Sequence, residues 1–199
     1  MKLICVTTIG VIMLLTNVGW NSGKQASNNP YGPKYTADNQ LVRPENYREW
    51  VWLSSGLGMT YGPIVESVQN GAPAFDNVFA SPVAYRSFLQ TGKWPDKTVL
   101  VLEVRSSSSE GSINKGGHFQ AGLMGIQVEV KDESRTPKWA FYRFQGSSGT
   151  GTLFPSSASC YSCHSLNGAV DNTFVQFYPT LLEVAKQKGT LQTSAETKQ

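Results

Sequence analysis

The chain has 199 residues, of which 40% are hydrophobic and 16% are charged, and its formal net charge is +3. This composition is typical of a globular protein and excludes an intrinsically disordered one. Because the charge is small and no run of Lys and Arg occurs, we expect no nucleic-acid partner.

The N-terminus has the pattern of an export signal. One lysine at position 2 precedes a short apolar run that ends at Val18. We expect residues 1–23 to direct export and the protein to be periplasmic. No Ala-x-Ala marks a cleavage site, so an uncleaved signal that anchors the protein in the membrane stays an alternative.

The rest of the chain divides by composition into three parts. Residues 24–40 are polar with Gly and Pro, which predicts a linker. Residues 41–190 have the size of one ordinary domain, and 191–199 form a polar tail.

The first half of the domain predicts short strands and one helix. Residues 44–50 predict a turn or short helix, 51–53 a strand, 55–74 a Gly- and Pro-rich loop and 75–80 a second strand. A helix is then expected from 82 to 91.

The limits of this helix are marked by its flanking residues. Ser81 is a suitable N-cap, Pro82 suits the first helical position, and Gly92 follows the last turn.

The middle of the chain predicts an antiparallel sheet. Residues 98–105 are rich in β-branched side chains, 123–131 alternate between apolar and polar, and 139–144 are aromatic. Residues 106–117 predict a long exposed loop. Because turns and not helices join these strands, they should pair antiparallel.

The last third predicts helices. Residues 156–166 hold a pair of cysteines, and 173–188 keep a helical spacing of apolar residues. Asp171 is expected to cap this second segment, and Pro179 to kink it or to begin its second half. The fold class is therefore α+β, a mostly antiparallel sheet with flanking helices.

Cys160 and Cys163, followed by His164, carry the strongest chemical signal. Two thiols three residues apart can each add to a vinyl group of one porphyrin, and the next residue can then ligate the iron. This spacing predicts one covalently attached haem c, on the C-terminal helical segment, with His164 as its metal ligand. Cys5 lies in the expected signal and plays no part.

Two other uses of the cysteine pair are disfavoured. A Cys-x-x-Cys redox centre is typical of a βαβ unit, which the pattern does not predict. A structural zinc site needs four protein ligands, and His118 is the one remaining His or Cys beyond the signal.

The sixth iron position is open in our interpretation. Met59, Met124 and His118 are the candidate ligands, but none stands in a marked ligand context. A ligand from His118 or Met59 would instead make the protein an electron carrier, an alternative that we keep.

Several segments together resemble the cytochrome P-460 family, which includes the cytochromes c′-beta, over about residues 41–188. The segments are Asn46-Tyr47-Arg48-Glu49-Trp50, Gly111-Ser112-Ile113-Asn114-Lys115-Gly116-Gly117-His118-Phe119, Trp139-Ala140-Phe141-Tyr142, Cys160–His164 and Phe174-Val175-Gln176-Phe177-Tyr178-Pro179. The resemblance implies a mostly antiparallel β fold, a homodimer and a five-coordinate haem.

The resemblance also implies residues on the far side of the iron. P-460 enzymes oxidise hydroxylamine with a lysine cross-linked to the porphyrin and a distal glutamate. We align Leu102 with that lysine and Gln127 with that glutamate, and Phe75 with a distal phenylalanine. The sequence is therefore closer to the cytochrome c′-beta type.

We accordingly favour a protein that binds nitric oxide or carbon monoxide and has no catalytic residue of its own. The alternative, hydroxylamine oxidation, would need Glu103 or Glu129 as a substitute base. The alternation of the strands predicts that both of these point outward. The sequence does not identify a redox partner.

Overall fold

The structure is a computed structural model that describes residues 29–60, 68–69 and 72–192. The predicted export signal, 1–23, and residues 193–199 of the predicted tail lie outside the described residues. Within the described part of the chain, no helix is both long and apolar enough to cross a membrane.

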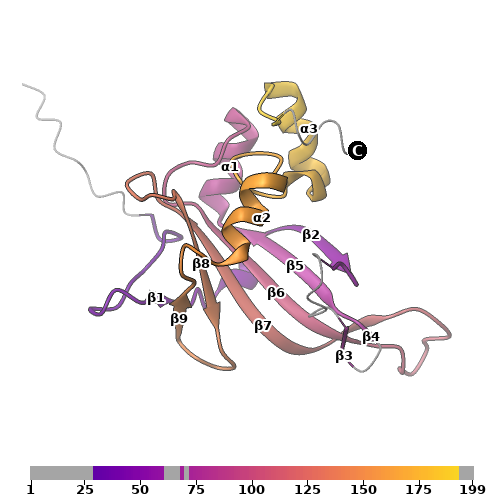
Figure 1. Cartoon of the computed structure of the whole chain (residues 1–199). Helices are drawn as coiled ribbons and strands as arrows, with labels where there is room; N and C mark the ends of the chain where they lie inside the picture. The colour runs from indigo at the N-terminus through magenta and orange to yellow at the C-terminus, as the bar shows by residue number, and fades with distance from the viewer. Residues whose placement is uncertain (1–28, 61–67, 70–71, 193–199) are drawn as a thin grey trace, which may run out of the picture.

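Seven antiparallel strands form the main sheet, in the order β1-β9-β8-β7-β6-β5-β2 (Figure 1). Their bounds are β1 Leu41–Val42, β2 Val51–Leu57, β5 Phe75–Ala80, β6 Val99–Ser108, β7 Phe119–Lys131, β8 Trp139–Phe144 and β9 Thr150–Leu153. The short strands β3, Val68–Gln69, and β4, Ala72–Pro73, pair separately.

Helices cover one face of this sheet. They are the helices α1 Pro82–Thr91, α2 Ser159–Asn167 and α3 Pro179–Lys188 and the 3₁₀ turn η2 Val175–Phe177. A second 3₁₀ turn, η1 Tyr47–Glu49, packs through Tyr47 on the opposite face. The three α-helices gather on the same side of the sheet (Figure 1). The predicted α+β class is confirmed.

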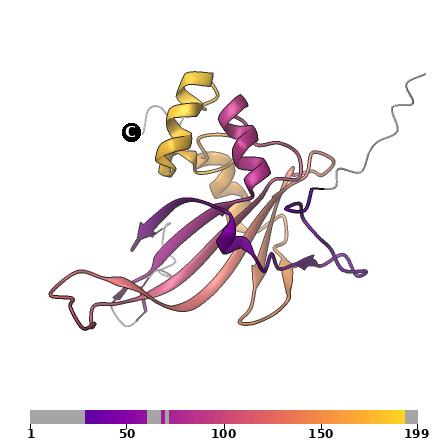
Figure 2. The ribbon, with the colours of Figure 1, turned by 180° about the vertical axis from the view of Figure 1, so that it is seen from behind.

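Each face of the sheet has its own core. The face toward the helices packs Leu100 and Phe141 against Phe88 of α1 and Leu181 of α3. The opposite face packs Val101 and its neighbours against the N-terminal segment, which runs across it in Figure 2. Because both faces are covered, polar side chains on either face are partly withdrawn from water.

Several predicted boundaries are confirmed. Helix α1 runs from Pro82 to Thr91, and Gly92 ends it in the left-handed region at φ 70°. Pro179 begins α3, since a proline is tolerated at the first helical position. The prediction for Asp171 is wrong, because it lies in a turn at φ 53° before η2 and pairs with Lys131.

The strands of the central hairpin are longer than predicted. Strand β6 continues to Ser108, into the first residues of the segment expected to be a loop, and β7 begins at Phe119, ahead of the predicted start at 123. Two further strands, β1 and β9, lacked a periodic signal because they are short and pair at the edge. The described part of the predicted linker also packs, with Tyr31 edge-on to the ring of Trp50.

Candidate functional site

Helix α2 brings both cysteines and the histidine to one side. Positions 160, 163 and 164 are three and four residues apart, so they lie on one helical face. Both thiols are unpaired and half-buried, and burial raises the pKa of Cys160. Two free thiols at this spacing remain available for a bond to a bound group.

The imidazole of His164 is held in one orientation. Its Nδ1 lies 2.9 Å from the carbonyl oxygen of Asn172. A carbonyl only accepts, so Nδ1 carries the proton and donates, which leaves the Nε2 lone pair free to ligate a metal. The ring also packs between Phe141 and Phe174, with centroids 4.5 and 4.3 Å away.

The free nitrogen of His164 points at the helix-side face of the sheet. Nε2 lies 3.6 Å from Oε1 of Glu129, on β7, and the glutamate side chain is 20% exposed. Burial raises the pKa of Glu129, and the charge of a protonated His164 opposes that shift.

Two rows of cross-strand partners line this face. One row runs Val78, Leu102, Gln127 and Arg143, and the other Ala80, Leu100, Glu129 and Phe141. Directly paired residues point to the same side of a sheet. The structure therefore brings Leu102 and Gln127 together and places them beside Glu129.

Phe75 does not join them. It is paired with Arg105 on β6, and it stands three positions before Val78 on the same strand without a bulge. Side chains alternate along a strand, so Phe75 points to the opposite face. The structure gives no support to its alignment with a distal phenylalanine.

The expectation that Glu103 points outward is wrong. Glu103 is 3% exposed and accepts from the hydroxyl of Tyr47, from Arg48 at 2.5 Å and from Asn77 at 3.3 Å. Arg105 adds an ion pair at 3.4 Å. Burial alone would raise the pKa of Glu103, but the Tyr47 hydrogen bond and the arginine charges outweigh it and lower the pKa.

The expectation for Glu129 is also wrong, and for a physical reason. The alternation of β7 predicts a solvent-exposed face opposite a buried face. Helix α2 and the residues after it cover the polar side, so Glu129 faces the imidazole and not water. The apolar spacing of the C-terminal segment was the sequence signal for such a cover, because those apolar residues need a sheet face to pack on.

The three candidate sixth ligands lie in different places. His118 is exposed between β6 and β7, at the end of the hairpin farthest from α2 (Figure 1). Met124 is the extra residue at an irregularity of the β6–β7 pairing, between Leu123 and Gly125. The sulfur of Met59 fills the space beside Gly56, whose partner Asp76 stands two positions before Val78 on β5. Met59 is therefore the candidate that shares the sheet face of Leu102 and Gln127.

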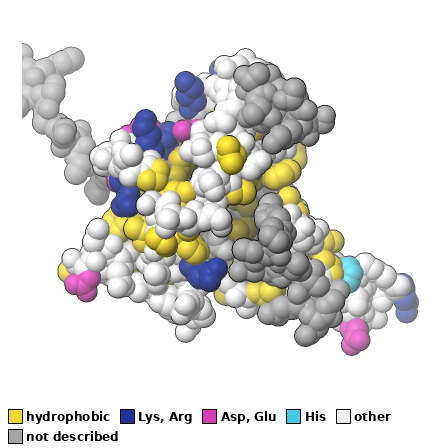
Figure 3. All heavy atoms as spheres, viewed as in Figure 1, with side chains coloured by type: hydrophobic (Ala, Val, Ile, Leu, Met, Phe, Trp, Pro, Cys, Tyr) yellow, Lys and Arg dark blue, Asp and Glu magenta, His cyan; other side chains and the backbone are white. Residues whose placement is uncertain are grey.

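These residues fit a haem. Helices α1 and α3 each bury two residues fully, whereas α2 buries none, and its Leu166 is 70% exposed. Hydrophobic side chains show at the surface between the helices and the sheet in the space-filling view (Figure 3). An apolar macrocycle held by two thioethers and one imidazole matches this donor set and this incompletely packed helix.

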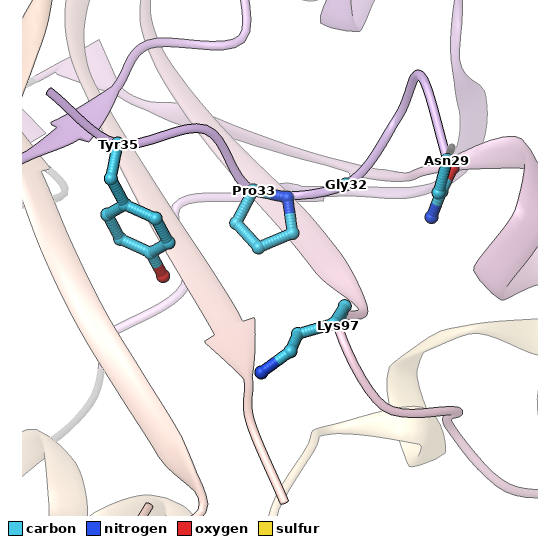
Figure 4. Close-up of a pocket in the computed structure, with 5 residues that line it drawn as sticks. All are labelled: Asn29, Gly32, Pro33, Tyr35 and Lys97. Atoms are coloured by element: carbon cyan, nitrogen blue, oxygen red, sulfur yellow. The ribbon is translucent and has the colours of Figure 1, made fainter. Parts of the chain in front are cut away.

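One pocket among the described residues lies away from this site. A pocket of about 260 Å³ opens beside the N-terminal segment, and the described residues that line it are Asn29, Gly32, Pro33, Tyr35 and Lys97 (Figure 4). None of them is a predicted site residue. Within the described residues, no group of three or more His, Cys, Asp and Glu could hold a metal ion.

Comparison with known protein families gives a match. The family model for Cytochrome P460 matches residues 44–175, which is more than half of the chain and spans the sheet from β2 to α2 with the Cys160–His164 motif. No curated protein matches the chain.

Proposed function

Because the chain belongs to the cytochrome P460 family, which makes it a haem cytochrome, we propose that it holds one haem c. Thioether bonds from Cys160 and Cys163 would attach the porphyrin, and Nε2 of His164 would ligate the iron. The observation that carries this proposal is the hydrogen bond from Nδ1 to Asn172, because it fixes the tautomer that leaves Nε2 free.

The bound haem would supply an iron atom with a coordination position for a small ligand. The chain's own residues would shape the space around that position. Leu102, Val78 and Leu100 line the sheet face and exclude water from it. Gln127 can donate or accept a hydrogen bond but cannot hold a proton.

We therefore propose that the protein binds small neutral diatomic gases, nitric oxide or carbon monoxide. The support is the apolar Leu102 and the neutral Gln127 in one cross-strand row, which ends in the exposed Arg143. Steric access and few polar partners favour such ligands over charged ones.

Optical titration of the reduced protein with carbon monoxide tests this proposal. We expect a stoichiometric change of the haem spectrum, one ligand per chain. A spectrum that carbon monoxide leaves unchanged would show that a protein ligand occupies the sixth position.

One observation favours a second function, oxidation of hydroxylamine or a related nitrogen compound. Glu129 faces His164, and burial raises the pKa of its carboxyl above the ordinary value, a direction that favours a general base. An assay with hydroxylamine and an artificial electron acceptor separates the two functions. Turnover that Glu129→Gln abolishes would favour the enzyme, and no turnover would leave gas binding.

The proposal includes export, as the N-terminal pattern predicts, and a homodimer, as the family resemblance implies. Attachment of haem c takes place outside the cytoplasm, which agrees with the signal pattern of residues 1–23. Fractionation of expressing cells and the mass of the purified protein in solution test these two points.

A further inference from the structure

The turn whose Asn172 carbonyl accepts the hydrogen bond from His164 has an unusual backbone. Asp171 and Asn172 both adopt the left-handed region, at φ 53° and 62°. Neither is a glycine, and residues with a Cβ adopt this region at a cost. Such a conformation persists where the surrounding structure imposes it, and it occurs often at functional sites.

Hydrogen bonds close this turn on itself. The amide of Thr173 donates to the carbonyl of Val170 at 2.8 Å, and the amide of Ala169 donates to the carbonyl of Thr173 at 2.8 Å. The Thr173 hydroxyl adds a bond to the Val170 carbonyl at 2.7 Å. The turn is therefore a compact unit with Asp171 and Asn172 at its tip.

Two side chains from the core side attach the turn to the rest of the fold. The indole of Trp94 donates to the Thr173 hydroxyl at 2.8 Å. Lys131, at the end of β7, pairs its ammonium with the carboxylate of Asp171. The Lys131 side chain is 7% exposed and also donates to the Trp94 carbonyl at 2.7 Å.

We propose that Lys131 and Asp171 are positioning residues for the iron ligand. Their ion pair fixes the tip of the turn, so the Asn172 carbonyl stays in line with Nδ1–H of His164. A firm hydrogen bond at Nδ1 makes the imidazole a stronger donor through Nε2. The pair thereby tunes the bond between histidine and iron, an inference that rests on the proposed haem.

The sharpest variant is Asp171→Asn. Asparagine tolerates the left-handed region as well as aspartate does, so the backbone of the turn is not strained by the change. Lys131 keeps its second partner, Glu133 at 3.0 Å, so no buried charge loses all of its partners. The variant removes one charge from the turn and leaves the fold intact.

Lys97→Met is the matched control. Lys97 forms an ion pair with Asp132 at 2.6 Å, but it is 41% exposed and none of its described contacts reaches the turn. Asn172→Gly is a second control, because the backbone carbonyl remains and glycine adopts a positive φ without cost.

Resonance Raman spectra and redox titration of the haem-loaded protein give the readout. In Asp171→Asn we expect the iron–histidine stretching band of the reduced protein to move to lower frequency. We also expect the midpoint potential to become more positive, because a weaker donor stabilises ferric iron less. Both shifts should exceed those of Lys97→Met and of Asn172→Gly.

The outcomes separate this inference from the proposed function. A wild-type iron–histidine band that Asp171→Asn leaves in place would overturn the positioning role and leave the proposed function standing. A band that Asn172→Gly moves as far would assign the effect to the Asn172 side chain, also against the inference. A wild-type protein without covalent haem would overturn both.

Discussion

The two faces of the sheet treat a glutamate in opposite ways. On the face toward the N-terminal segment, Glu103 receives hydrogen bonds or ion pairs from Tyr47, Arg48, Asn77 and Arg105. On the face toward the helices, the contact described for the carboxylate of Glu129 is the ring of His164. One carboxylate is fully satisfied by the protein itself, and the other is not.

This difference teaches which face serves stability and which serves function. Withdrawing a charge from water costs several kcal/mol unless hydrogen bonds compensate it. The chain provides that compensation around Glu103. Around Glu129 it places a neutral amide, two free thiols and a histidine instead, an arrangement that suits a group from outside the chain.

The largest expected effect comes from removing both attachment points. In the double variant Cys160→Ala, Cys163→Ala, we expect no haem to remain on the polypeptide, because no thioether can form. Haem staining of denaturing gels measures this.

The single variants provide the control for that experiment. Cys163→Ala should keep one thioether and reduced staining, and His164→Ala should keep the attached haem but lose its axial bond. Staining of the double variant equal to that of the wild type would show that the thiols do not attach the haem.

A matched pair of substitutions contrasts the two faces directly. Glu103→Gln should lower the free energy of unfolding by about 2–4 kcal/mol, because the two arginines, which can only donate, lose the charge and one acceptor oxygen of the carboxylate. Glu129→Gln should change it by less than about 1 kcal/mol, because no comparable network is lost.

Urea unfolding of the two variants measures these free energies. The haem spectrum and the ligand affinity should respond in the reverse order, with Glu129→Gln the more affected. Equal losses of stability in the two variants would remove the contrast between the faces.

The loss of stability at low pH tests the role of the face toward the N-terminal segment, where Glu103 lies. The pKa of Glu103 is lower in the folded protein than in the unfolded chain, so its contribution is present above the unfolded pKa. It is lost as the pH falls through the folded pKa, below about 4.3. Unfolding measured from pH 7 to pH 3 should show this loss in the wild type and not in Glu103→Gln.

The smallest effect is expected at Asp76, on the face toward the helices. Burial raises its pKa to about 6, so its charged form destabilises the fold at neutral pH. Stability from this group should rise as the pH falls from 7 through 6 toward 4. Asp76→Asn should stabilise the protein at pH 7 by roughly 1 kcal/mol after solvent screening, and should remove that pH dependence.

Much of the fold was accessible from the sequence because its signals are local. The cap residues around α1, the alternation of β7 and the proline at the start of α3 each act within a few residues. The Cys160–His164 motif is local too, and its three side chains share one helical face as expected.

The features that the sequence does not predict depend on contacts between segments that are far apart in the chain. The apolar spacing of the C-terminal segment predicts packing on a sheet but does not tell that helix α2 covers the polar side of β7, so the sequence alone places Glu129 at the surface. The partners of Glu103 come from η1, β5 and β6, and those of Asp171 from the end of β7. The side chains that hold His164 in place could be identified once the tertiary structure was known.

Peptide mass mapping of the purified wild-type protein tests the central claim most directly. After extraction with acidified acetone and digestion, we expect the peptide that contains Cys160, Cys163 and His164 to carry the mass of one haem. The same peptide at its unmodified mass, with all pigment in the acetone, would contradict the account.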